Sequence, residues 1–255
     1  MAEPPNLFAL PPGADFPAEL VAGLLQRGKG KPPEALARVT LIVNTQRMRR
    51  RVGEVFQASG ARLLPRILLV TETAPLADLA LPAPISPLRR RLELSVLLDR
   101  LLATGTTHFP RTALYDLADS LATLMEEMQG EGVSPARIAA LDVANHSAHW
   151  ARTQAFLGIV TEALSDESPD AEAILRRAVT RLAETWATTS PAHPVILAGS
   201  TASRGTTALM AEAIARLPNG AVVLPGFDFD LPAPVWDSMD DALTAEDHPQ
   251  YRFRR

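Results

Sequence analysis

Apolar runs of four or five residues alternate with helix-period patterns at both ends of the chain. Continuous apolar runs of this length predict strands buried on both faces, and apolar residues three or four positions apart predict helices. The first 75 residues give strands over 6–10, 39–43 and 67–70, with helical patterns over 16–25 and 46–56 between them. Two further strands, 195–198 and 221–224, enclose another helical pattern. Strands that alternate with helices predict an α/β domain with a parallel sheet.

The middle of the chain has a different character. From Pro87 to about Ser190 only helical periodicity appears, over residues 88–102, 114–128, 150–164 and 171–186. We therefore predict an all-helical insertion, residues 86–190, in one α/β domain formed by residues 1–85 and 191–255.

The amino-acid composition excludes several kinds of catalytic and metal site. The 255 residues include no cysteine, which excludes disulfides, thiolate nucleophiles and cysteine-held metal or iron–sulfur centres. The chain has no apolar run near the ~20 residues that cross a bilayer and no secretory signal pattern, so we expect no membrane contact and a cytoplasmic location. The net charge is −4, but residues 1–100 are net basic. That part of the chain is the expected surface for nucleic acid or phosphate.

Polar residues follow two of the predicted strands. In open α/β sheets ligands bind outside the carboxyl ends of the strands, where a phosphate backbone could be held. Four arginines at positions 47 and 49–51 spread over more than one helix face, so we expect about two to reach a ligand and the others to pair with acids. The predicted DNA-binding residues are Asn44, Thr45, Gln46, Arg47, Arg50 and Thr71.

A phosphate-cradling P-loop needs several glycines and a lysine. The first predicted strand is followed instead by PPGADF, with one glycine, no lysine, and Asp15 where an anion would bind. ATP binding is therefore not expected there. The tip of the strand 195–198, where a motor ATPase of this architecture carries its magnesium-binding acid, reads Gly199-Ser200-Thr201.

The segment Gly199–Gly205 allows two interpretations. Ser200, Thr201 and Arg204 could hold a phosphate group at a helix N-terminus, or the hydroxyls could simply cap the helix, which we favour. A small α/β enzyme that uses this segment with Asp228 is the alternative in a different class. His146 and His149 have metal-ligand spacing but lack a convincing third ligand, so we predict no metal site.

Several runs together resemble the N-terminal part of AddB, the alphaproteobacterial-type subunit of the AddAB helicase–nuclease. They include ARVTLIVNTQRMRRR, PVILAGSTASRG, LPGFDFDLPAPVW and TAEDHPQYRF, and the resemblance covers essentially the whole chain. It implies a RecA-like, superfamily 1 helicase-like domain without a P-loop and with a helical insertion.

The resemblance also implies a function and partners. AddB works with AddA, which supplies the ATP-driven motor, and guides single-stranded and double-stranded DNA and reads the Chi sequence during double-strand break repair. Asn44 to Arg47, and Thr71, match the strand ends that touch single-stranded DNA. The nuclease and its iron–sulfur cluster belong to the C-terminal part of the family, so no cofactor is expected here. The chain stops at Tyr251–Arg255 without a closing element, which suggests a longer protein. A purely structural module that docks AddA is the remaining alternative.

Overall fold

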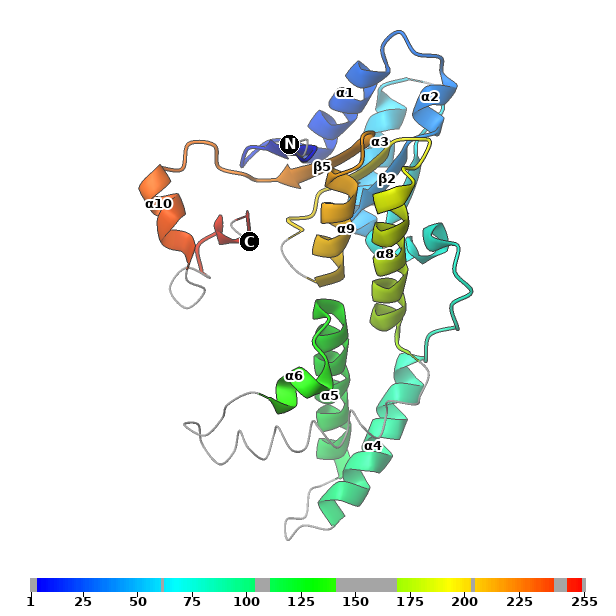
Figure 1. Ribbon diagram of the computed structural model, residues 1–255, viewed down its shortest axis with the longest axis vertical. Coiled ribbons are helices and arrows are strands. Elements are labelled where there is room, and N and C mark those ends of the chain that lie inside the picture. Colours follow the sequence, from blue (N-terminus) through cyan, green and yellow to red (C-terminus); the bar gives the residue numbers. More distant parts are fainter. Residues whose placement is uncertain are drawn as a thin grey trace. The chain divides into compact units, whose positions relative to one another are not determined.

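A five-stranded, all-parallel sheet forms the core of one of the two compact units of the chain. The computed structural model describes residues 4–60, 62–103, 111–140, 169–202, 205–240 and 247–253. The strands are β1 (Leu7–Leu10), β2 (Thr40–Val43), β3 (Arg66–Leu69), β4 (Val195–Ala198) and β5 (Gly220–Pro225), in the spatial order β1-β5-β4-β2-β3. Figure 1 labels β2 and β5 of this sheet. The predicted α/β class and parallel sheet are confirmed, and the arrangement is consistent with a Rossmann/RecA-like α/β fold.

One face of the sheet is covered by α1 (Phe16–Gly28) and α3 (Gln46–Ala58). Side chains on a strand alternate between the two faces, so Leu41 and Val43 of β2 join this core while Ile42 points to the other face. The helices contribute apolar residues at four-residue spacing, which places them in one stripe toward the sheet. The stripes consist of Phe16, Leu20 and Leu24 on α1, and Met48, Val52 and Phe56 on α3.

The opposite face is covered in part by α9 (Gly205–Ala215), which connects β4 to β5. Met210 and Ile214 of α9 are almost completely buried. Because both faces are packed, β4 is buried along its whole length, and its four residues are all apolar. The alternation of polar and apolar residues that marks a half-exposed strand is therefore absent from β4.

The remaining elements of the sheet domain are short. They are α2 (Glu34–Ala37), the 3-10 turns η1 (Val70–Glu72) and η2 (Ala74–Ala77) after β3, and α10 (Ala233–Asp237), η3 (Ser238–Asp240) and η4 (Tyr251–Phe253) after β5. After β5, Phe227 packs edge-on against Phe229, Trp236 and Phe253. The Gln250 side chain ties this segment together, since it accepts from the Asp228 N–H and donates to the Gly226 carbonyl.

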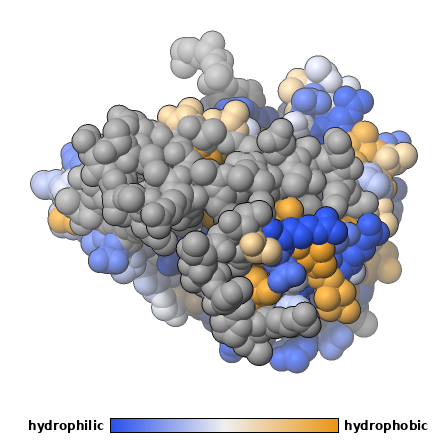
Figure 2. Space-filling model, turned by 90° about the horizontal axis from the view of Figure 1, so that it is seen from below, coloured by the Kyte–Doolittle hydropathy of each residue, from blue (hydrophilic) through white to orange (hydrophobic). Residues whose placement is uncertain are grey.

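The helical part contains α4 (Pro87–Ala103), α5 (Arg111–Glu131), α6 (Pro135–Ala139) and the first residues of α8 (Ala171–Thr188). Leu94 and Leu98 of α4 pack against Ala118 and Leu121 of α5. The Arg176 guanidinium donates to the Gly130 carbonyl and so ties α8 to the end of α5. Leu88, Leu92 and Val96 lie exposed at four-residue spacing on α4. Figure 2 shows apolar residues among hydrophilic ones on the face that it presents.

The chain divides into two compact units, Met1–Asp78 with Ala178–Arg255, and Leu79–Arg177. The second division falls within α8, whereas the sequence placed the boundary after it, at residue 190. The helical pattern over 150–164 lies outside the described residues. None of the helices in the described ranges is long and apolar enough to cross a membrane.

Two glycines with opposite surroundings test the packing of the sheet domain. A Cβ at Gly220 would overlap the backbone carbonyl of Ile214 and lie 2.9 Å from Leu217 Cβ, whereas a Cβ at Gly23 in α1 meets nothing within 4 Å. We expect Gly220→Ala to cost more than about 2 kcal/mol of unfolding free energy. Gly23→Ala should add about 0.5–1 kcal/mol, because alanine favours a helix. Urea unfolding measures both, and a neutral Gly220→Ala would contradict the described turn.

Glu126 on α5 makes the stability of the helical unit depend on pH. Partial burial of its carboxyl and, to a lesser degree, the nearby carboxylates of Asp170 and Glu172 raise its pKa above the ordinary 4.5. Ionisation is thus less favourable in the folded state, and stability falls as the pH rises from 4.5 through the raised pKa. We expect Glu126→Gln to be more stable than the wild type above that window and equal to it below, in unfolding measured across pH. Glu127→Gln controls for net charge.

Candidate functional site

The sheet reverses its winding direction between β2 and β4. The chain leaves β2 through α3 and enters β3 on one side, and it leaves β4 through α9 and enters β5 on the other side. The two helices cover opposite faces of the sheet, so a crevice opens between the carboxyl ends of β2 and β4. Ligands of open α/β proteins bind at such switch points. The residues that follow these strands, Asn44 and Gly199, therefore mark the candidate site.

Two segments that are distant in the sequence meet closely in this crevice. A Cβ placed on Gly199 would lie 3.6 Å from Asn44 Oδ1 and 3.0 Å from Met48 Cε, so the loop after β4 passes directly beside the start of α3. Gly199 also has a φ of 80°, a backbone conformation that residues with a side chain rarely adopt. The positive φ therefore favours glycine at this position. The structure thereby brings together two segments that the sequence indicated as separate candidate binding sites, Asn44–Arg47 and Gly199–Thr201.

The first turn of α3 forms the outer wall of the site. The Thr45 hydroxyl oxygen accepts a hydrogen bond from the Met48 N–H at 3.1 Å and caps the helix. Asn44, Thr45, Arg47 and Arg50 are exposed, and with four other residues they line a shallow open pocket of about 450 Å³. Four of the six predicted DNA-binding residues thus share one concave surface.

Acids of the chain neutralise some of the arginines of α3. Arg49 forms a 2.7 Å ion pair with Glu72 of η1, and Arg51 lies 3.5 Å from both Asp15 and Glu54. Arg50 forms a longer ion pair with Glu54, at 3.7 Å, and its side chain is 79% exposed. Three of the four arginines thus pair with acids, whereas the sequence led us to expect about two to remain available for a ligand. Arg47 is exposed, and no acid within the described part of the chain pairs with it.

Position on the helix makes the charge of Arg47 costly. The N-terminus of a helix carries partial positive charge, so cations there are unfavourable by about 0.3–1 kcal/mol each. The first turn of α3 contains no acidic residue. Glu72 offsets this cost for Arg49, but none of the acids among the described residues offsets it for Arg47. A local rule broken without compensation is typical of a functional position.

The first strand end is closed to a phosphate group. Asp15 Oδ1 accepts a hydrogen bond from the Ala18 N–H at 3.3 Å and caps α1, and Arg51 lies on its other carboxylate oxygen. The amide groups at this helix start, which a P-loop would offer to ATP, therefore face the chain's own carboxylate. A phosphate would be repelled here.

The other predicted residues have local roles or lie elsewhere. Gln46 accepts from the Arg49 Nε and so helps to hold the Arg49–Glu72 pair. Ser200 Oγ accepts from the Ala202 N–H, which is a local turn contact and does not cap α9, because that helix begins only at Gly205. Thr71 is exposed in η1, beside Glu72. Arg204, together with Asp142, His146 and His149, lies outside the described residues.

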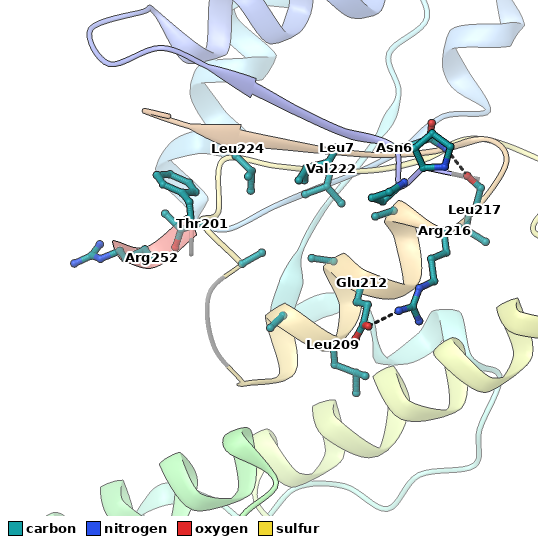
Figure 3. Close-up of a pocket in the computed structure, with 17 residues that line it drawn as sticks. Asn6, Leu7, Thr201, Leu209, Glu212, Arg216, Leu217, Val222, Leu224 and Arg252 are labelled. Carbon is teal, nitrogen blue, oxygen red and sulfur yellow. Dashed lines mark hydrogen bonds and ion pairs between the residues drawn. The ribbon is translucent and has the colours of Figure 1, made fainter. Parts of the chain in front are cut away.

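A second pocket lies on the opposite face of the sheet, between α9 and the strands β1 and β5 (Figure 3). It has a volume of about 1060 Å³ and is lined mainly by apolar residues such as Leu7, Val222 and Leu224. Glu212 and Arg216 pair with each other at 2.5 Å on its rim. Thr201 lines this pocket but Asp228 does not, so the pocket does not unite the residues of the alternative enzyme hypothesis. No group of three or more possible metal ligands occurs in the described ranges.

Two residues that contribute to the site were not predicted from the sequence. Glu72 holds Arg49 and also accepts from the Leu69 N–H at 3.1 Å, so it fixes the end of β3 to α3. Met48 fills the space beside Gly199. The four-residue spacing of Met48 and Val52 could have indicated the buried side of α3. Nothing in the sequence signalled that Glu72 would face Arg49.

No family model matches the chain, and no curated protein matches it.

Thr45 tests whether the cap shapes the site. We expect Thr45→Ala to lower the unfolding free energy by about 1 kcal/mol, because it removes the hydroxyl that accepts from Met48. Thr45→Ser keeps the hydroxyl and should change stability by only a few tenths of a kcal/mol. Urea unfolding of both variants provides the comparison. Equal losses in the two would show that the methyl group, and not the cap, matters.

Proposed function

We propose that this chain is a catalytically inactive, helicase-like DNA-guiding domain, the N-terminal segment of an AddB-type subunit of an AddAB helicase–nuclease. In this proposal single-stranded DNA runs along the carboxyl edge of the sheet and contacts Asn44, Arg47 and Arg50. AddA is the partner that supplies the motor, and the complex acts in double-strand break repair. The single observation that carries the proposal is the exposed, uncompensated Arg47 in the open pocket at the switch point.

The polarity of the site supports a nucleic-acid backbone as its ligand. Phosphate contacts in proteins come from arginines, amide and hydroxyl side chains and helix N-termini, and these groups line the pocket here. The pocket is shallow and open, which suits a chain passing across it better than an enclosed small molecule.

The first strand end supports a role without ATP. A motor domain needs a lysine and free amides for the terminal phosphates, and an acid for magnesium at a neighbouring strand tip. Here Asp15 occupies the first position through its cap of α1, and Gly199 to Thr201 occupy the second. Such a domain would keep the DNA path of a helicase while its partner hydrolyses ATP.

Arg47→Gln tests the site directly. We expect threefold to tenfold weaker binding of labelled oligothymidine at low salt, since one exposed charged contact is lost. The dependence of log affinity on log salt should flatten by about 0.7, the contribution of one phosphate contact to single-stranded nucleic acid. Fluorescence anisotropy over a salt series measures both quantities.

Arg181→Gln is the matched control, because it removes the same charge from an arginine on α8 that pairs with Glu184. It should bind oligothymidine as the wild type does. The proposed site is wrong if both variants lose affinity equally, or if the wild type shows no affinity for oligothymidine at low salt.

A further inference from the structure

A second basic site lies on the sheet domain, at the amino-terminal edge of the strands. An open pocket of about 380 Å³ is formed by the end of α1, the loop after it, α2, and the turns that precede β4 and β5. Its volume falls within the range of small-molecule sites. It lies at the opposite ends of the strands from Asn44 and shares no lining residue with the pocket at Arg47.

The inner lining of this pocket is apolar. It consists of side chains on the face of the sheet that α1 covers, and it is continuous with the main core. The lining includes Leu24, Leu36, Val39, Ile196 and Ala221. Most of these residues are already buried in the core, so a ligand held here would rest an apolar or aromatic body against the more accessible lining residues Phe8, Leu36 and Pro218.

The rim carries four basic side chains from four different segments. They are Arg27 near the end of α1, Lys31 in the following loop, Arg38 after α2, and His193 before β4. No Asp or Glu lines the pocket. Glu34 is the nearest acid in the sequence, yet among the described residues neither it nor any other acid pairs with these four side chains.

The guanidinium of Arg27 is held at the pocket by an aromatic ring. Its Cζ lies 4.7 Å from the centroid of the Phe8 ring, and Phe8 also lines the pocket. Stacking on an aromatic face leaves the N–H groups of arginine in the plane of the guanidinium free to donate. Arg27 is therefore positioned to bind an anion with little loss of side-chain freedom.

We propose that this pocket binds a small phosphate monoester that carries an apolar or aromatic body. A phosphate monoester has a charge of about −1.5 to −2 at neutral pH and three acceptor oxygens, which suits several converging cations better than a single carboxylate does. The body of the ligand lies on the apolar lining, and Arg27, Lys31 and Arg38 contact the phosphate. The site is independent of the DNA path proposed above.

The two lysines of the chain provide a matched pair for the test. Lys31 lines the pocket, whereas Lys29, two residues earlier in the same exposed loop, does not. The probes are AMP as a phosphate monoester with an aromatic body, adenosine as its uncharged counterpart, and inorganic phosphate. Calorimetric titration of the full chain at low salt compares the wild type, Lys29→Gln, Lys31→Gln and the double variant Lys31→Gln/Arg38→Gln.

We expect AMP to bind the wild type at least tenfold more tightly than inorganic phosphate or adenosine. The double variant should lose at least tenfold in affinity for AMP, and Lys31→Gln part of that, while Lys29→Gln binds normally. Unchanged thermal unfolding shows that the exposed substitutions leave the fold intact. The proposal is overturned if the wild type does not bind AMP, or if Lys29→Gln weakens binding as much as Lys31→Gln. A further contrary result concerns oligothymidine. If neither the wild type nor the double variant binds AMP, and the double variant has lost its affinity for oligothymidine, the basic rim is a nucleic-acid contact and the proposal is overturned.

Discussion

The pairing of β2 with β4 is the contact on which the sheet domain depends. It joins residues 40–43 to residues 195–198, and the whole helical unit lies between them in the sequence. Its register sets Val43 opposite Ala198, so the next residues of the two strands, Asn44 and Gly199, emerge side by side. The candidate site therefore exists only because two distant parts of the chain share one ladder. Buried apolar strands make that ladder stable, since water has little access to either face.

The helices α1 and α3, which cover the same face of the sheet, differ in how charged residues are placed at their ends. Asp15 at the start of α1 caps the helix and pairs with Arg51, whereas Arg27 near its end lies at the basic pocket. Both placements agree with the direction of the helix dipole. The start of α3 does not follow that preference, because Arg47 is exposed and no acid in the described ranges pairs with it. One helix thus obeys the local electrostatic rule at both ends, and its neighbour breaks the rule at the proposed DNA site.

The sequence predicted the elements of the sheet well, for a simple physical reason. A four-residue apolar run such as Val195–Ala198 favours a strand covered on both faces, and the four-residue spacing of Phe16, Leu20 and Leu24 fits one face of a helix. The apolar run Leu7–Leu10 also forms a strand, although Leu7 and Phe8 are exposed. The end of β3 was less predictable. Val70 was expected in the strand, but η1 begins there, and the Thr73 hydroxyl donates to the Val70 carbonyl within that turn. A bond between residues three positions apart leaves no periodic signal.

The sequence indicated which residues follow the strands at the candidate site, but it did not indicate which of their charges remain unpaired. Asn44 to Arg47 were recognisable because polar residues directly follow a buried strand. Which arginines remain available was not, because Glu72 and Asp15 reach α3 from other segments. The basic pocket illustrates the same limit, since Arg27, Lys31, Arg38 and His193 form no pattern in the sequence. The sequence by itself determined which segments are strands and helices, because burial imposes their period. Only the tertiary structure decided which charges are neutralised and which converge, because that depends on the distances between segments brought together by the parallel sheet.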